Sequence, residues 1–224
     1  MPSLARYSTF APRFSFLLLI LILTLPTQTF AQSTPTLRFT EIMYDLDGSD
    51  TGREWAELYN YGTDPVEILT GTATTSFRFF DGSNHTLKVF QGGAIMPPSG
   101  FAILVDAPDT WLLERQGFTG TIFDTVLSLK NTSSTIGLSI NTTEPLFTSI
   151  VYDFSWGAAG DGHTLEKRDI LLADDSAANW TVSTLASGTP GFWEPFVSVT
   201  PTTTATTTKP TATTTPQETQ PTPP

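Results

Sequence analysis

Short apolar runs separated by polar turn residues are the main pattern in the middle of this chain. Runs of this length, bounded by Gly, Pro, Asn and Asp, are typical of β-strands. We expect strands at residues 37–44, 53–60, 76–80, 86–90, 101–105, 135–140, 147–153, 164–168 and 180–184. Their regular spacing favours an all-β fold, a two-layer antiparallel β-sandwich, over alternating strand–helix units.

The segment 53–60 (Arg-Glu-Trp-Ala-Glu-Leu-Tyr-Asn) alternates apolar and polar side chains most clearly. Successive side chains of a strand point to opposite faces of its sheet. Ala56 and Leu58 are therefore predicted to share one face, while Trp55 and Glu57 lie on the other.

One short helix is predicted near residues 107–116. Asp106 can cap its first turn, and Pro108 lies in that turn, where its missing amide hydrogen costs nothing. We expect Trp111 and Leu112 to fasten this helix over an open end of the sandwich.

Four sequence elements follow one another in a fixed order. They are Arg53-Glu54-Trp55-Ala56-Glu57-Leu58-Tyr59-Asn60, then Trp156-Gly157 with the segment 160–167, then Asn179-Trp180, then Gly188-Thr189-Pro190-Gly191. In this order and separation the chain resembles the lamin-tail domain (LTD) family over residues 37–195. That family has an immunoglobulin-like β-sandwich and occurs in nuclear lamins and in exported bacterial proteins. The resemblance implies a non-enzymatic module that binds partners or tethers neighbouring modules. We also expect Trp156, Leu165 and Trp180 to be buried close together.

The first 31 residues resemble an export signal. Arg6 and Arg13 precede an apolar run at residues 14–26, and small residues flank a cleavage position after Ala31. The run is shorter than the ~20 residues that cross a bilayer, so we expect a cleaved signal peptide and a secreted or cell-surface protein. The alternative is an uncleaved N-terminal membrane anchor.

The segment 196–224 is rich in Thr and Pro and has almost no bulky apolar side chain. Such a composition does not bury enough apolar surface to offset chain entropy. We expect a disordered stalk or linker.

Charge and cysteine content limit the classes of function that the chain can have. The formal net charge is −11, with 22 acidic and 11 basic side chains. This balance argues against binding to nucleic acid and to membrane surfaces, and it suits cations or cationic partners. We also expect no stable membrane insertion after signal cleavage. The chain has no cysteine, so thiol chemistry and thiolate metal sites are excluded.

Asp45, Asp47 and Asp50 are the best metal candidates, because calcium prefers several oxygen ligands in one flexible loop. The spacing fails the EF-hand pattern, which needs Gly where Asp50 stands and Glu where Ala56 stands. We therefore expect a solvent-exposed turn with at most weak Ca²⁺ binding and no other cofactor.

Other catalytic constellations are not expected. Glu54 and Glu57 lie three positions apart on one strand, so they point to opposite faces and do not form a glycosidase acid–base pair. We expect Glu57 to be partly buried and paired with Arg53, Arg78 or Lys88.

The two histidines, His85 and His163, are too few for a multi-histidine metal site. We expect His85 to form hydrogen bonds in a turn or at a strand edge. Gly160 and Gly162 suggest that Asp161 and His163 form a tight turn.

The sequence therefore predicts a non-catalytic interaction or tethering module, whose partner is a protein or a component of the cell envelope. Two alternatives remain open. One is a secreted hydrolase with an acidic, calcium-assisted site, and the other is a structural spacer of the cell envelope.

Overall fold

The structure, a computed structural model, describes residues 36–72, 75–140 and 148–194. The chain divides into two units, Met1–Thr34 and Pro35–Pro224, and all described residues belong to the second unit. The expected signal peptide at 1–31 and the expected stalk at 196–224 lie outside the described residues.

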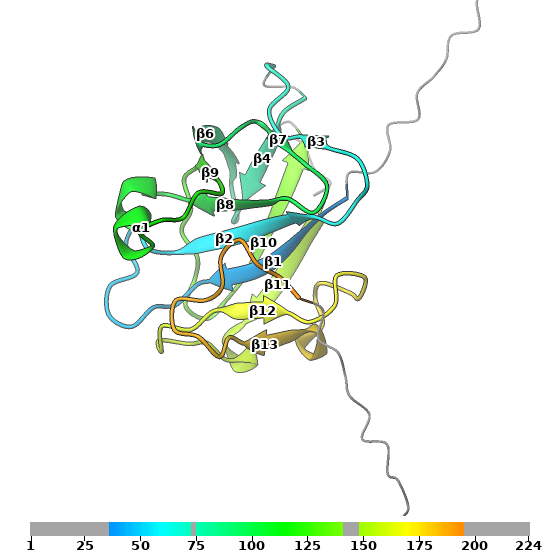
Figure 1. Ribbon diagram of the computed structural model, residues 1–224. Helices are drawn as coiled ribbons and strands as arrows, with labels where there is room; N and C mark the ends of the chain where they lie inside the picture. Colours follow the sequence, from blue (N-terminus) through cyan, green and yellow to red (C-terminus); the bar gives the residue numbers. More distant parts are fainter. Residues whose placement is uncertain (1–35, 73–74, 141–147, 195–224) are drawn as a thin grey trace, which may run out of the picture. The chain divides into compact units, whose positions relative to one another are not determined.

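The described residues form an all-β sandwich with one short α-helix (Figure 1). The larger sheet has seven strands in the order β13-β12-β1-β2-β8-β9-β6. Their bounds are Trp180–Val182, Leu165–Lys167, Leu37–Met43, Trp55–Asn60, Phe101–Val105, Thr121–Asp124 and Lys88–Gln91.

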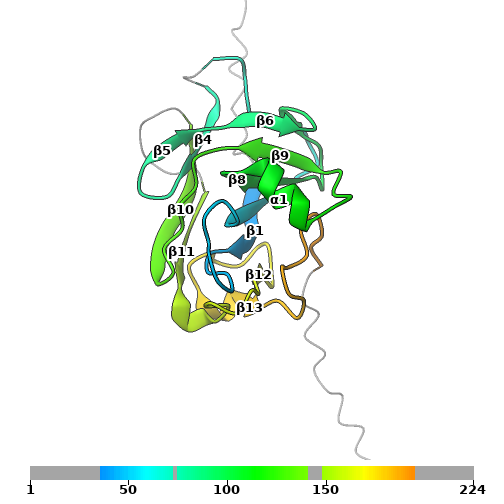
Figure 2. The same ribbon diagram turned by 90° about the vertical axis from the view of Figure 1, so that its left-hand side faces the viewer.

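The smaller sheet has four strands and packs against one face of the larger sheet (Figure 2). Its order is β11-β10-β4-β5, with bounds Thr148–Asp153, Ser133–Ile140, Phe77–Phe80 and Asn84–Thr86. A two-stranded ribbon pairs β3 (Val66–Glu67) with β7 (Ile95–Met96). The helix α1 spans Pro108–Glu114, and two 3₁₀ turns span Phe154–Trp156 and Ala177–Asn179.

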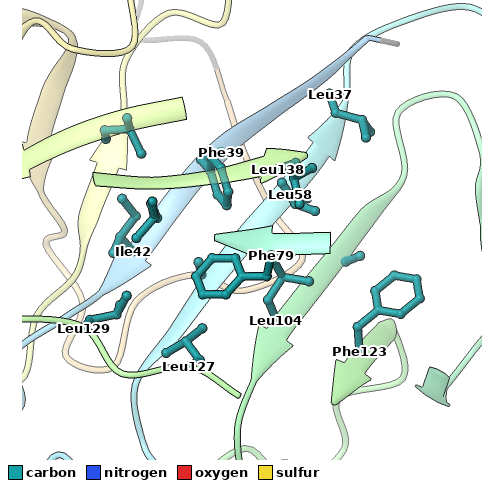
Figure 3. Close-up of a cluster of buried hydrophobic side chains, with 14 of the residues drawn as sticks. Leu37, Phe39, Ile42, Leu58, Phe79, Leu104, Phe123, Leu127, Leu129 and Leu138 are labelled. Atoms are coloured by element: carbon teal, nitrogen blue, oxygen red, sulfur yellow. The ribbon is translucent and has the colours of Figure 1, made fainter. Parts of the chain in front are cut away.

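The core lies between the two sheets and is built from the alternation that the sequence shows. Ala56 and Leu58 of β2 face this core, as expected. Figure 3 shows Phe79 of β4 directed toward Leu58 and Leu104 of the larger sheet. All three of these side chains are fully buried. Each Å² of apolar surface that leaves water stabilises the fold by roughly 25 cal/mol. In a domain without disulfides, this burial is the main stabilising contribution.

The paired strands are antiparallel, as expected, except at one strand pair. Strands β8 and β9 pair in parallel, with Ile103 opposite Ile122. Parallel neighbours need a crossover connection, and the segment 106–120 with helix α1 provides it. All other paired strands are antiparallel in the part of the chain that the structure describes.

Helix α1 occurs where the sequence predicts it, but its cap and its packing differ. The N-cap is Ala107 and makes no side-chain hydrogen bond, so the prediction that Asp106 caps the helix is wrong. Pro108 lies at the start of the helix, as expected. Trp111 is fully buried against Trp55, with ring centroids 5.9 Å apart. The helix therefore covers the outer face of the larger sheet and not an open end of the sandwich. No helix among the described residues is long and apolar enough to cross a membrane.

Leu165 and Trp180 are buried in the main core, as expected, whereas Trp156 is only partly buried and packs against the same core. The indole Nε1 of Trp180 donates a hydrogen bond to the backbone oxygen of Asp174 at 2.8 Å. The Lys167 ammonium lies 4.6 Å from the centre of the Trp180 ring. Trp180 therefore joins β12, β13 and the loop between them.

We predict that Trp180→Ala lowers the free energy of unfolding by about 3–5 kcal/mol, because it leaves a cavity and removes the hydrogen bond to Asp174. Denaturant unfolding followed by circular dichroism measures this change. Leu113→Ala is the control, since Leu113 is 73% exposed on helix α1 and its replacement costs at most about 0.5 kcal/mol. An unchanged unfolding midpoint in Trp180→Ala would show that this side chain does not support the core.

Candidate functional site

The outer face of the larger sheet, which points away from β10 and β11, is covered by two segments. Helix α1 covers one part of it. Residues 187–194, which we call the strap, cross in front of β12 and β1 and are drawn in orange in Figure 1. Figure 2 shows the strap and the smaller sheet on opposite sides of β1.

Glu57 of β2 lies under the strap and is completely buried. Its Oε1 accepts a hydrogen bond from the Thr40 hydroxyl at 2.6 Å, and its Oε2 accepts one from the backbone N–H of Gly191. A buried carboxylate needs such donors because it has lost its water. Burial of Glu57 is therefore more complete than the sequence predicts.

The prediction that Glu57 pairs with Arg53, Arg78 or Lys88 is wrong. The Arg53 guanidinium instead binds Glu114 of helix α1, with Nε and Oε1 2.6 Å apart. Arg78 and Lys88 lie on strands of other parts of the sandwich, and the partners of Glu57 are a hydroxyl and a backbone amide.

Glu41 of β1 lies beside Glu57 and is 1% exposed. Its Oε1 accepts hydrogen bonds from the Thr164 hydroxyl and from the backbone N–H of Thr189, the latter at 2.8 Å. Its Oε2 is buried and has no hydrogen-bond partner among the described residues. The neighbouring Glu166 accepts a hydrogen bond from the Thr189 hydroxyl at 3.1 Å.

The strap approaches Glu41 so closely that only glycine fits at position 188. The backbone of Gly188 has φ of 76°, and a Cβ there would lie 2.0 Å from Oε1 of Glu41. Glycine adopts this left-handed conformation without the steric penalty of other residues. The expected Gly-Thr-Pro-Gly element thus has a specific task, which is to bring backbone amides to two buried acids.

Two further contacts hold the ends of the strap. The indole Nε1 of Trp193 donates to the backbone oxygen of Lys167 at 2.7 Å, and its ring lies 5.6 Å from that of Tyr59. At the other end, the Arg115 guanidinium donates to the backbone oxygen of Ser187 at 3.3 Å.

Burial changes the acidity of these carboxyl groups. Loss of hydration raises the pKa of Glu41 from its usual 4.5 to about 7, although the hydrogen bonds from Thr164 and Thr189 act in the opposite direction. The pKa of Glu57 is raised well above its usual range, mainly by burial and then by the nearby charge of Glu41. Two acids that share one dry region favour proton uptake.

Glu54 lies elsewhere, at the edge of the main core. Its Oε2 accepts a hydrogen bond from the backbone N–H of Leu129 at 3.2 Å, and burial raises its pKa to about 8. Leu129 belongs to the core between the sheets, whereas Glu57 faces the strap. The two glutamates are therefore on opposite faces, as the sequence predicts.

The acidic loop is less exposed to solvent than expected. Asp47 is exposed, but Asp45 and Asp50 are only partly exposed. The side-chain amide of Asn131 donates to Oδ1 of Asp45 at 2.9 Å and to Oδ2 of Asp50 at 2.8 Å. A neutral amide thus bridges the two carboxylates. The described residues contain no group of three or more acidic or histidine side chains arranged to hold a metal ion.

Both histidines have local structural partners. Nε2 of His85 lies 2.8 Å from Oδ1 of Asp81, and His85 belongs to the edge strand β5, which confirms its expected role as a hydrogen-bonding residue at a strand edge. Asp161 accepts a hydrogen bond from the backbone N–H of His163 and not from its ring. Gly160 and Gly162 have φ of 65° and 76°, as the expected tight turn requires.

Sequence reasoning missed Glu41 as a site residue. One signal was present, because Glu41 is the only carboxylate in the otherwise largely apolar run 37–44. The alternation of β1 also breaks there, since a β-bulge lies between Phe39 and Glu41. A charged residue inside a buried strand usually marks a specific polar contact.

Comparison with known proteins finds no protein family, no curated protein and no solved structure that matches this chain.

We predict that the protein is more stable at pH 5 than at pH 8. The raised pKa values of Glu41, Glu54 and Glu57 mean that the folded state holds protons that the unfolded state has released. This stabilisation is complete below the unfolded pKa near 4.5 and is lost as pH rises through folded values of about 7 and 8. The thermal midpoint should fall over this range.

Glu57→Gln tests whether the carboxyl group of Glu57 contributes to this pH dependence of the thermal midpoint. The amide oxygen of the Gln side chain accepts the hydrogen bond from the N–H of Gly191, and its NH2 group donates to the Thr40 hydroxyl oxygen. Unlike the carboxyl group of Glu57, the amide takes up no proton. The fall of the thermal midpoint between pH 5 and pH 8 should therefore be smaller than in the unaltered chain. Glu67→Gln, at an exposed position of β3, is the matched control. Its thermal midpoint should decrease between pH 5 and pH 8 as much as that of the unaltered chain. A midpoint that rises with pH would contradict this account.

We predict that calcium binds the acidic loop weakly and that Asn131→Asp strengthens its binding at least tenfold. The substitution replaces the bridging amide by a third carboxylate, which repels Asp45 and Asp50 unless a cation enters. Calorimetric titration measures the difference, with Asn131→Ala as the control that removes the bridge without adding charge. Sub-micromolar binding by the unaltered chain that disappears in Asp47→Ala would instead identify a natural calcium site.

Proposed function

We propose that this domain is a non-catalytic interaction and tethering module of the lamin-tail type, carried on a secreted or cell-surface protein. The sequence features that support it are the export-signal pattern, the ordered motifs and the Thr/Pro-rich segment that follows the domain.

The main observation that supports this proposal is that hydrogen bonds hold the strap against the larger sheet. The strap directly precedes residues 195–224, so anything attached through the Thr/Pro-rich segment pulls first on the strap. Glu57 and Glu41 accept hydrogen bonds from strap amides, and both acids sit on central strands of the larger sheet. A C-terminal connection anchored at the centre of a sheet suits a tether.

The state of the carboxylates also supports a non-catalytic role. In the sites described above, Glu57 uses both oxygens on Thr40 and Gly191, and Asp45 and Asp50 are bridged by Asn131. A hydrolase of the acid–base type needs two carboxyl groups on either side of one substrate bond. Glu54, which directly precedes β2, and Glu57 of β2 lie on opposite faces of the larger sheet, which does not favour that chemistry.

The proposed partner is a protein or a cell-envelope component with a cationic surface. The net charge of −11 disfavours nucleic acid and attracts positively charged groups over a distance of about 10 Å at moderate ionic strength.

A cell-binding assay tests the proposal. The full chain, labelled on its C-terminal segment, is incubated with cells of its source organism, and the bound label is measured as a function of concentration. We expect saturable binding that weakens with added salt. A peptide of residues 196–224 alone should not bind, because the folded domain makes the contact.

Two outcomes would contradict the proposal. Non-saturable or absent binding favours the structural spacer. Hydrolysis of a polysaccharide, ester or phosphodiester substrate that is lost in Glu54→Gln favours the secreted hydrolase.

A further inference from the structure

Three glutamates form one row across the outer face of the larger sheet. Glu166 of β12 lies directly opposite Glu41 of β1, and Glu41 lies directly opposite Glu57 of β2. Residues directly opposite each other on neighbouring antiparallel strands point to the same face, with Cβ atoms about 5 Å apart. We call these three residues the glutamate row. Like charges at this spacing repel each other, so the row is unfavourable when all three carboxyl groups are ionised.

The strap makes a hydrogen bond to every member of the glutamate row. The backbone N–H of Thr189 donates to Oε1 of Glu41 at 2.8 Å, and the Thr189 hydroxyl donates to Oε1 of Glu166 at 3.1 Å. The backbone N–H of Gly191 donates to Oε2 of Glu57. Residues 189–191 therefore cover the row and separate it from water.

The closed strap stabilises the ionised row poorly. Glu57 is 0% exposed and Glu41 is 1% exposed, and Oε2 of Glu41 is buried with no hydrogen-bond partner among the described residues. A carboxylate that lacks both water and a full set of donors is costly. Loss of hydration accordingly raises the pKa of Glu41 to about 7 and that of Glu57 well above its usual range. Water would reach both carboxylates if the strap moved away.

The neighbouring cations are engaged elsewhere and do not neutralise the row. Arg115 lowers the pKa of Glu41, but its guanidinium also binds Glu114 and the backbone oxygen of Ser187. The guanidinium of Arg38 and the ammonium of Lys167 both bind Asp174. Two further titratable side chains lie near the row, Glu194 in the cavity of about 230 Å³ beneath the strap and Tyr59 against Trp193.

The strap is attached to the domain without being part of its core. Every residue from 187 to 194 is at least partly exposed, and both clusters of buried apolar side chains come from other segments. Segments that bury few apolar side chains open at a lower free energy than the core does. The strap can therefore detach while the two sheets stay packed.

We propose that the strap is a pH-controlled cover. It is closed over the glutamate row while Glu41 and Glu57 hold their protons, and it detaches when they ionise, with the sandwich beneath it still folded. This switch is a property of the domain itself and does not depend on the proposed function.

Proton linkage sets the direction of the change. Opening returns the carboxyl groups to water, where their pKa is near the usual 4.5, whereas the closed strap holds them at raised values. The protons therefore stabilise the closed strap fully below about pH 4.5, and this stabilisation is lost as pH rises through about 7 for Glu41 and through a higher value for Glu57. Each carboxyl group that releases its proton on opening lowers the ratio of closed to open strap by up to about tenfold per pH unit.

Fluorine NMR of the full chain, labelled with 5-fluorotryptophan, tests the proposal. Trp193 reports on the strap, whereas Trp111 of helix α1 and Trp180 of the main core report on the rest of the domain. As pH rises from 5 to 9, we expect the Trp193 signal to move toward that of free 5-fluorotryptophan and to return when the pH is lowered. The signals of Trp111 and Trp180 should keep their folded positions.

Glu57→Gln removes one titrating group from the row and keeps an acceptor for the N–H of Gly191. We expect the closed-to-open ratio to depend on pH less steeply than in the unaltered chain, by up to about tenfold per pH unit. Glu67→Gln on the exposed strand β3 is the matched control and should give the full pH dependence.

Gly188→Ala should produce the open strap at every pH, because its Cβ would collide with Oε1 of Glu41 and with the Thr164 side chain. We expect the Trp193 signal of this variant to lie at its high-pH position already at pH 5. Gly71→Ala is the control for backbone strain, since Gly71 has φ of 79°, close to the 76° of Gly188, but has no atom within 4 Å of an added Cβ. This variant should keep the strap closed at pH 5.

Three results would overturn the proposal. One is a Trp193 signal that does not move between pH 5 and pH 9. Another is a shift of Trp193, Trp111 and Trp180 together, either with pH or in Gly188→Ala, because the strap would then open only when the whole domain unfolds. The third is a Glu57→Gln variant that keeps the full pH dependence.

Discussion

The burial of Glu41 and Glu57 on the outer face of the larger sheet is the constraint on which the C-terminal part of the domain depends. A carboxylate that leaves water needs donors in return, and here the strap supplies them from its backbone at Thr189 and Gly191. The backbone comes close enough only because position 188 has no side chain. The acids and the strap therefore form one unit, since the loss of either leaves buried polar groups without partners.

Helix α1 and the strap both cover this outer face, but different interactions hold them in place. Helix α1 is held mainly by aromatic packing, with Trp111 against Trp55, and such contacts do not titrate. The strap is held by hydrogen bonds to carboxyl groups whose pKa values lie near or above neutral pH. Changes of pH therefore act on the strap and leave the helix packing unaffected. The end of the domain that leads into the Thr/Pro-rich segment is thus sensitive to pH.

Most of the fold could be predicted from sequence, because strands of five or more residues show the two-residue alternation of a half-buried sheet. Strands β3, β5, β7 and β9 were missed. Strands β3 and β7 have only two residues each, too few for a period to appear, and β5 (Asn-His-Thr) and β9 (Thr-Ile-Phe-Asp) show no alternation of apolar and polar residues. The parallel pairing of β8 with β9 was missed because alternation carries no information on strand direction. Within the candidate site, Glu57 was noticed but its partners were not. They come from Gly191, 134 positions away, and Thr164 and Thr189 reach Glu41 across 123 and 148 positions. No local pattern encodes contacts of that range.

The two acidic regions of the domain show why the number of carboxylates does not define a site. Asp45 and Asp50 attract attention in the sequence, yet one neutral amide, that of Asn131, satisfies an oxygen of each. Glu41 is inconspicuous in the sequence, yet it retains a buried oxygen beside a cavity lined by the strap. The donors that the fold brings to each carboxylate oxygen therefore distinguish these two regions, and the number of carboxylates does not.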